Sequence, residues 1–286
     1  MPQYEIYRRG ENGKFYLMHD STDEVQTCLN SLQNVVRTAS GANAAAIQAA
    51  VDQFRNDLGP LNPNVAMTFP TGRREINWDG VPDAFSAPNN LPANFFNVNS
   101  PRGAIFSSPC SPSLFRVSST AASGNPVRFG ELDPNYTTAF TTFSAQRLFT
   151  VIPVFPNSCN ILTINFFAAG TTTPATVSGF GAVFTDVDIT GMARFTCFNA
   201  AGGLLGGGVF EPAAASNGLS FIGVSFNEGE RIAQCQITSG SVGLAPGHID
   251  GLNFADVVAM DDFIYGEPQP IPTPPPTKAE GDGVAK

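Results

Sequence analysis

The fold class is decided by the stretch Leu219-Ser220-Phe221-Ile222-Gly223-Val224-Ser225-Phe226. Successive side chains of a β-strand point to opposite faces, so Ile222, Val224 and Phe226 share one face of a half-buried strand. A short polar loop follows, and the run Arg231–Thr238 repeats the alternation. Two adjoining runs of this kind predict neighbouring antiparallel strands.

Similar short runs continue along most of the chain and are separated by clusters of Gly, Pro, Asn and Ser. The expected strands are Arg74–Trp78, Gly103–Ser107, Ser113–Ser118, Leu148–Val154, Ile161–Phe167, Gly179–Asp186, Ala193–Asn199, Leu205–Phe210, Leu219–Phe226, Arg231–Thr238 and Asp256–Tyr265. No helical pattern lies between them. The sequence therefore predicts a mainly β fold, an antiparallel β-sandwich, for which a jelly roll is the most economical topology.

The composition changes twice along the chain and predicts three parts. Residues 1–60 are expected to form a small N-terminal α+β segment, with a hairpin, a helix running from the capping box Ser21–Glu24 to Val36, and a second helix over Ala44–Leu58. Residues 61–266 hold the sandwich. Residues 267–286 form a Pro-rich flexible tail that is expected to be dispensable for folding.

Charge and composition exclude several classes of protein. The chain has 286 residues, of which 14% are charged, and a net charge of -9, which opposes binding to nucleic acid. No apolar run approaches the ~18 residues of a membrane helix, and no signal peptide is visible at the start. Because Thr, Ser, Asn, Gly and Phe are abundant and Lys is scarce, an extracellular or cell-surface location is expected.

The five cysteines are widely spaced and form no zinc-binding motif. They are Cys28, Cys110, Cys159, Cys197 and Cys235. Cys197 and Cys235 fall within expected strands, and we predict that both are small buried core residues that are not linked to each other. A disulfide between them would instead indicate an oxidising compartment.

The sequence offers few residues for catalysis. There are two histidines, His19 and His248, and no nucleophile elbow, zinc-protease motif or phosphate-binding loop. The glycine-rich run Gly202–Gly208 lacks a following Lys-Ser/Thr pair and predicts a flexible hairpin turn. We therefore expect no catalytic residues and a protein that is not an enzyme.

Carboxylates within the expected strands are more informative. Asp261 and Asp262 lie in the middle of a run that is apolar on both faces, so at least one of them is expected to be buried. Glu75 and Asp79 share one face of the run Arg74–Gly80. Hard oxygen ligands at strand ends suit Ca²⁺, and pairing with arginines or capping of turns is the alternative that the residues leave open.

The run Phe180–Asp188 also ends in acids, Asp186 and Asp188. Here a core strand runs directly into an Asp-x-Asp pair.

Five stretches carry a resemblance to known proteins. They are Arg73–Val81, Leu91–Asn97, Gly179–Asp188, Gly229–Ala233 and Met260–Gly266. Over about residues 45–266 the chain resembles an uncharacterised group of secreted bacterial proteins, similar to the jelly-roll domains of PEP-CTERM-type exported proteins and to carbohydrate-binding modules. The resemblance implies a structural calcium ion held by Asp261 or Asp262 and by Glu75 or Asp79.

Two functions follow from these features as expectations. The first is a non-catalytic, calcium-stabilised β-sandwich that binds a glycan, extracellular matrix or another surface, with Tyr136 and Phe140 as loop aromatics. The second is a self-assembling structural subunit of a surface layer, filament or appendage. A glycoside hydrolase or lyase, which needs two facing carboxylates, is less favoured.

Overall fold

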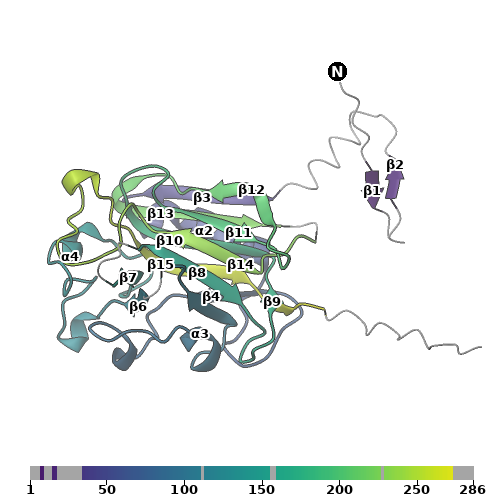
Figure 1. Cartoon of the computed structure of the whole chain (residues 1–286), viewed down its shortest axis with the longest axis horizontal. Coiled ribbons are helices and arrows are strands. Elements are labelled where there is room, and N and C mark those ends of the chain that lie inside the picture. The colour runs from purple at the N-terminus through teal and green to yellow at the C-terminus, as the bar shows by residue number, and fades with distance from the viewer. Residues whose placement is uncertain are drawn as a thin grey trace, which may run out of the picture.

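The computed structural model describes residues 7–9, 15–17, 34–110, 113–154, 159–226 and 229–272. In this part of the chain strands predominate, and two antiparallel sheets form the body (Figure 1). The mainly β, antiparallel class predicted from the alternation is confirmed. The jelly-roll connectivity stays a prediction.

The larger sheet has seven strands. Its spatial order is β3 (Val35–Gly41), β13 (Ala215–Ser225), β10 (Gly179–Val187), β15 (Ala259–Gly266), β7 (Phe149–Pro153) and β6 (Ser113–Val117), and β4 (Arg73–Ile76) pairs with the second half of β15. The smaller sheet has five strands, in the order β12 (Leu204–Phe210), β11 (Arg194–Phe198), β14 (Gln234–Thr238), β8 (Ile161–Phe166) and β5 (Ala104–Ser107). Each strand expected between residues 74 and 265 is present, with its ends within four residues of the prediction.

The remaining elements are short, apart from one helix. The paired strands β1 (Tyr7–Arg9) and β2 (Phe15–Leu17) match the expected hairpin, and β9 (Ala175–Thr176) pairs with β16 (Gln269–Pro270). The helices are α2 (Ala44–Leu58), α3 (Phe95–Val98) and α4 (Tyr136–Ala139), with single 3₁₀ turns η1 (Asp83–Phe85), η2 (Ala121–Ser123) and η3 (Leu252–Phe254). No described helix is long and apolar enough to cross a membrane.

The main core lies between the two sheets. Phe180 of β10 meets Phe195 of β11 edge-on, with ring centroids 5.2 Å apart, which places one sheet against the other. Trp78 lies just beyond β4, is buried as expected, and stacks on Phe149 at 4.2 Å. Its indole Nε1 donates to the backbone oxygen of Asp261 (2.8 Å), so the indole nitrogen is satisfied inside the core.

Helix α2 covers the outer face of the larger sheet. Its apolar stripe, Ile47, Val51, Phe54 and Leu58, packs on β10, β13 and β15. The helix was predicted over these residues, and Asn43 caps its start by accepting from the backbone nitrogen of Ala46. Because side chains cover both faces of the sheet, β10 and β15 are buried along their whole length.

The segment before α2 differs from the prediction. Val36, expected at the end of a helix, lies in β3, which pairs with β13 from Val35–Ser225 to Gly41–Leu219. β3 is an edge strand of the larger sheet, and its residues alternate between half-buried and exposed, so its pairing with β13 determines the conformation of this segment. Residues 35–58 therefore pack as part of the body, whereas the rest of the predicted helix lies outside the described residues.

The beginning of the expected tail is also docked. Glu267 is buried and pairs with the fully buried Arg74, whose Nη2 donates to Oε1 (2.9 Å). Gln269 and Pro270 then form β16 against β9. The expectation of a free tail is therefore wrong for residues 267–272, and residues 273–286 lie outside the described part.

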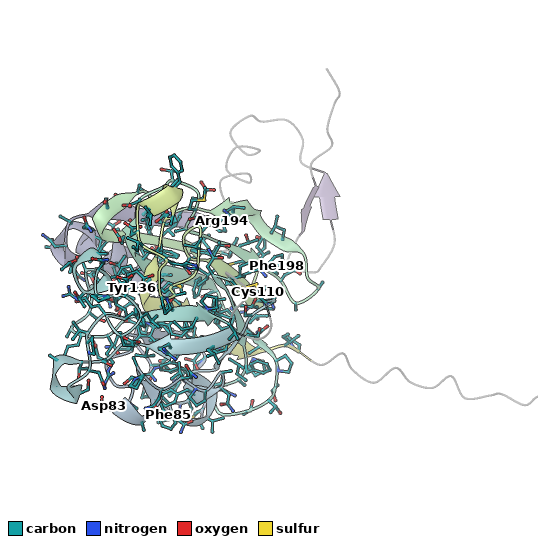
Figure 2. The ribbon with its side chains drawn as sticks, turned by 60° about the vertical axis from the view of Figure 1, so that its left-hand side comes forward. Asp83, Phe85, Cys110, Tyr136, Arg194 and Phe198 are labelled. Carbon is teal, nitrogen blue, oxygen red and sulfur yellow. A yellow bond between two sulfur atoms is a disulfide. The ribbon has the colours of Figure 1, made fainter. Side chains whose placement is uncertain are left out.

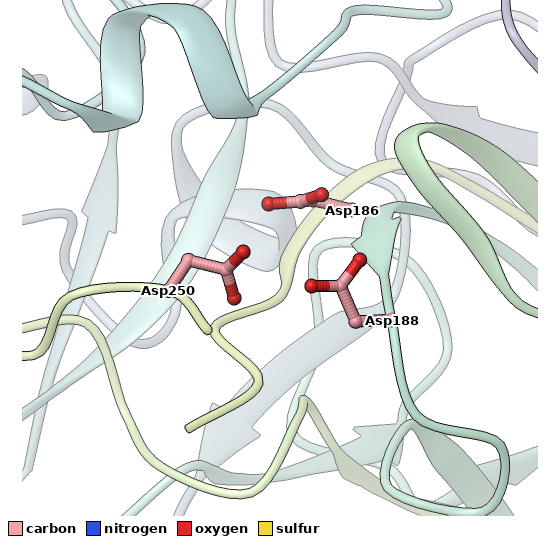
Figure 3. A group of neighbouring side chains, drawn as sticks. All are labelled: Asp186, Asp188 and Asp250. Atoms are coloured by element: carbon pink, nitrogen blue, oxygen red, sulfur yellow. The ribbon is translucent and has the colours of Figure 1, made fainter. Parts of the chain in front are cut away.

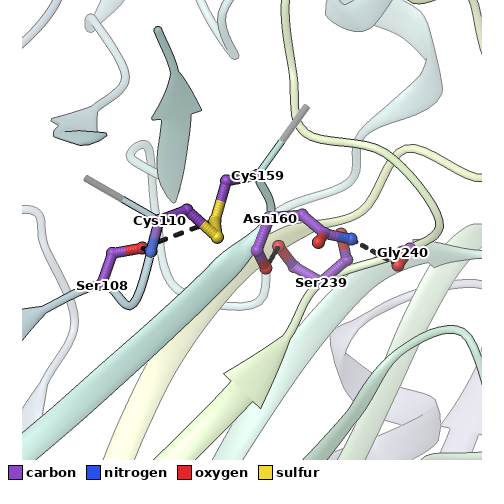
Figure 4. Close-up of a disulfide and its surroundings, with 6 residues drawn as sticks. All are labelled: Ser108, Cys110, Cys159, Asn160, Ser239 and Gly240. Carbon is purple, nitrogen blue, oxygen red and sulfur yellow. Dashed lines mark hydrogen bonds between the residues drawn. A yellow bond between two sulfur atoms is a disulfide. The ribbon is translucent and has the colours of Figure 1, made fainter. Parts of the chain in front are cut away.

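The structure corrects the cysteine prediction. Cys197 and Cys235 face each other across β11 and β14, with Cα atoms 4.3 Å apart, and form a disulfide. Cys110 and Cys159 form a second one, beside Ser108 and Asn160 (Figure 4; Cys110 is also marked in Figure 2). Two disulfides favour an oxidising, extracellular environment, as the composition suggested. Cys28 lies outside the described residues.

The glycine-rich run is only partly a turn. The expected hairpin turn occupies residues 199–203, and the rest of the run belongs to β12, an edge strand of the smaller sheet. Gly206, Gly207 and Gly208 have φ values of 63°, 81° and 136°, outside the extended region. An irregular edge of this kind is a poor template for pairing with a second chain.

Candidate metal centre

Among the acids expected to hold calcium, Glu75 lies between two arginines. Arg55 of α2 donates from Nε to Oε1 (3.0 Å) and from Nη2 to Oε2 (2.9 Å), and Arg73 donates to Oε1 (2.6 Å). The helix covering this face of the sheet thus supplies a cation to the half-buried carboxylate.

Asp261 and Asp262 lie nearby on β15 and are both buried. Asp261 accepts from the backbone nitrogen of Phe143 (2.6 Å) and from Oγ of Ser144 (3.0 Å), and Asp262 lies 3.6 Å from Nη2 of Arg55. Burial, together with the charge of Asp262, raises the pKa of Asp261 well above its ordinary value. Burial raises the pKa of Asp262 to about 6, although hydrogen bonds and the charge of Arg55 act in the opposite direction.

Asp79 lies apart from these three and caps a turn. Its Oδ1 accepts from the backbone nitrogens of Gln146 (2.9 Å) and Arg147 (3.0 Å). The structure therefore shows the arginine-paired alternative for Glu75 and the turn-capping alternative for Asp79. Asp262 has Arg55 nearby, but its Oδ1 is buried without a hydrogen-bond partner among the described residues.

A different group of carboxylates converges at one end of the larger sheet (Figure 3). One carboxylate oxygen from each of Asp186, Asp188 and Asp250 lies within 4.8 Å of the other two. Asp186 lies near the end of β10, at a bulge in its pairing with β13, and Asp188 follows directly after the strand. Asp250 comes from the long loop between β14 and β15.

Few donors reach this group. Asp186 is fully buried; its Oδ1 accepts from the backbone nitrogen of Asn217 (2.7 Å), but its Oδ2 is buried without a hydrogen-bond partner among the described residues. Oδ1 of Asp188 is also buried without a hydrogen-bond partner among the described residues. Asp250 accepts from the backbone nitrogen of Val257 (3.2 Å). Burying a carboxylate oxygen without a hydrogen-bond donor costs free energy of folding. A positively charged partner bound to this group would compensate for that cost.

The pKa values reflect this lack of compensation. Burial, with the charges of Asp250, Asp188 and Asp256 added, raises the pKa of Asp186 to about 7. Burial raises the pKa of Asp250 to about 6, and the neighbouring acids again add to the shift. No arginine forms an ion pair with these three acids in the described ranges. A cation bound between them would remove the repulsion that these shifts report.

Carboxylate oxygens suit a hard cation. Ca²⁺ takes about six to eight oxygen ligands, and three aspartates that bind with one or both oxygens provide about half of these or more. The three carboxylates therefore suit a divalent ion such as Ca²⁺ as its ligands. Asp186 and Asp188 were visible as an Asp-x-Asp pair at a strand end, but Asp250 was missed because only the folded loop brings it to β10.

The loop aromatics expected to meet a glycan are not exposed. Tyr136 and Phe140 are fully buried in a third apolar cluster together with Phe129, Leu244 and Val257 (Tyr136 is marked in Figure 2). The hydroxyl of Tyr136 donates to the backbone oxygen of His248 (2.5 Å). Its role is to anchor the loop that carries Asp250.

Comparisons with known proteins give little. No protein-family model matches the chain, and no curated protein matches it. One similar solved structure is the enzymatically active domain of tailspike protein 4 of bacteriophage CBA120, with a TM-score of 0.30 and 10% sequence identity. The alignment covers 72% of this chain and 24% of that one, so this chain spans about a quarter of the tailspike structure.

One expectation is corrected by this comparison. The chain was expected not to be an enzyme, and the structure it matches is described as enzymatically active. We therefore withdraw that expectation. The likeness is too distant to bring an activity or a substrate to this chain, and we assign neither from it.

Proposed function

We propose that the chain is an extracellular, calcium-binding β-sandwich of jelly-roll connectivity that attaches to an extracellular surface through the loop closed by the ion. The supporting observation is the buried Oδ2 of Asp186, which has no hydrogen-bond partner among the described residues and belongs to a carboxylate that lies beside those of Asp188 and Asp250. An ion at this point links the end of β10 to the β14–β15 loop. Both disulfides are consistent with an extracellular location.

Isothermal titration calorimetry tests the calcium site. Metal-free protein is titrated with Ca²⁺ and, separately, with Mg²⁺, which requires a compact octahedron and is expected to bind more weakly. We expect one calcium site in the parent protein and its loss in Asp186→Asn. Asp52→Asn, which changes an exposed acid of α2, is the matched control and should keep the site. Failure of the parent protein to bind calcium would refute the proposed function.

A further inference from the structure

The loop that carries Asp250 also forms a hollow in the surface, of about 290 Å³. Val242, Ile249, Leu252 and Phe254 provide its apolar lining, and Ser241 and His248 provide polar groups. Ligand sites commonly combine an apolar lining with a few placed hydrogen-bonding groups. The volume is near the lower end for such sites and suits a single ring.

An aromatic side chain is exposed at the hollow. Phe254 is 89% exposed, the highest value among the large apolar residues of the described chain. Its backbone has φ 62°, in the left-handed region that a bulky residue seldom adopts. Ile249 and Leu252 beside it are exposed as well. A group of exposed apolar side chains on one loop is typical of a binding surface.

The two polar residues provide one acceptor and one donor. Nδ1 of His248 donates to the backbone oxygen of Gly243 (2.7 Å), which makes Nε2 of the neutral ring an acceptor. Oγ of Ser241 accepts from the backbone nitrogen of Asp256 (2.9 Å), so its own hydrogen is available to donate. A sugar hydroxyl can both donate and accept, and therefore matches both groups.

Charge narrows the class of ligand. The loop over residues 240–256 contains Asp250 and Asp256 but neither Lys nor Arg, and the whole chain has a net charge of -9. Anionic saccharides and anionic lipid surfaces are therefore disfavoured, since both are attracted by basic residues. A neutral ring with an apolar face for Phe254 and hydroxyls at its edge remains the best match.

We propose that this hollow binds a ring of a neutral saccharide, which stacks on Phe254 and forms hydrogen bonds with His248 and Ser241. The inference rests on the proposed function, because the calcium ion would hold Asp250, and with it the adjoining wall residue Ile249, in place. Saccharide binding is accordingly expected to require calcium.

An array of neutral oligosaccharides of glucose, galactose, mannose and xylose tests the inference. Polygalacturonate is the acidic comparator, and phosphatidylcholine vesicles are the membrane comparator. The calcium-loaded parent protein should be retained by at least one neutral saccharide, and chelator should abolish retention. Phe254→Ala and His248→Ala should each weaken binding about tenfold or more. Leu204→Ala, on the exposed edge strand β12, is the matched control and should bind as the parent does.

The outcomes separate the two proposals. The melting temperature of each variant is measured with calcium and with chelator, and Phe254→Ala should keep the full calcium shift. If that shift is present but no neutral saccharide is retained, the inference fails and the calcium site stands. Retention that is unchanged by Phe254→Ala, or that occurs only on polygalacturonate or vesicles, also overturns it. If the parent protein shows no calcium shift, the proposed function itself fails.

Discussion

Two groups of buried and half-buried carboxylates on the larger sheet have different surroundings. Around Arg55, the acids Glu75, Asp261 and Asp262 receive a guanidinium, a backbone nitrogen and a hydroxyl, and only Oδ1 of Asp262 is left without a hydrogen-bond partner among the described residues. At the end of β10, Asp186 and Asp188 each have a buried oxygen that no described donor reaches. In both groups, aspartates lie in or directly after strands rich in apolar residues, so these stretches look alike in sequence. The groups differ in that Arg55 places a positive charge beside the first, whereas no arginine pairs with the second among the described residues.

The cause of the difference is the element that covers each group. Helix α2 lies over one face of the sheet and brings Arg55 to Glu75 and Asp262. The β10 end is covered by the β14–β15 loop, which contributes another acid, Asp250. The first group therefore has a guanidinium of the chain beside it, and the second has no such cation among the described residues.

The largest expected effect concerns the most completely paired acid. Glu267→Ala leaves the fully buried Arg74 without its carboxylate, and it should lower the free energy of unfolding by about 3–5 kcal/mol. Urea denaturation measures the loss. Asp57→Ala removes the exposed partner of Arg37 and should cost less than about 1 kcal/mol. Equal losses in the two variants would show that burial of the ion pair is unimportant.

A smaller loss is expected at the arginine-paired group. Arg55→Met removes the cation from Glu75 and Asp262 and should cost about 2 kcal/mol, since the guanidinium is partly exposed. The calcium-induced shift of the melting temperature should not change, because the ion binds elsewhere. If calcium stabilises Arg55→Met more than the parent protein, these acids form a second cation site once the arginine is gone.

The pH dependence of the metal-free protein sharpens the comparison further. The folded-state pKa values of Asp186 and Asp250, about 7 and about 6, lie above those of an unfolded chain. A raised carboxyl pKa contributes stability that is complete below the unfolded value and is lost as the pH rises through the folded one. In chelator, the melting temperature should therefore fall by a few degrees between about pH 5 and about pH 8.

Calcium should reduce the fall of the melting temperature with rising pH, because the ion takes the place of the protons on Asp186 and Asp250. Asp262 also has a raised pKa, of about 6, and its contribution should persist when calcium is present. Melting curves at several pH values, with and without calcium, measure both parts. A slope that calcium does not alter would mean that the ion does not bind at Asp186.

Alternation along the chain was sufficient to locate the strands of the body, because each strand has a buried face that is readable from its own residues. It failed where the deciding contact is remote. Val35–Gly41 became an edge strand because β13 pairs with it, and a capping signal upstream could not reveal this. The link between Cys197 and Cys235 depends on the register of β11 against β14, which the sequence does not specify.

The candidate site could be predicted only in part, again because the deciding contacts are remote in the sequence. Asp186 and Asp188 could be recognised at the end of a strand, but their third partner lies some sixty residues further along the chain, in a loop with no strand pattern. Asp261 and Asp262 attracted attention because both faces of their strand are apolar. The sequence could not show that α2 would place Arg55 beside them.

The most direct test of the account compares the calcium response of two variants. At a free concentration of ~100 times its dissociation constant, an ion that binds only the folded protein adds about 2.7 kcal/mol, a melting shift of several degrees. Asp186→Asn should abolish this shift, and Asp262→Asn should keep it in full. A shift that survives Asp186→Asn and disappears in Asp262→Asn would contradict the account and place the ion among the acids around Arg55.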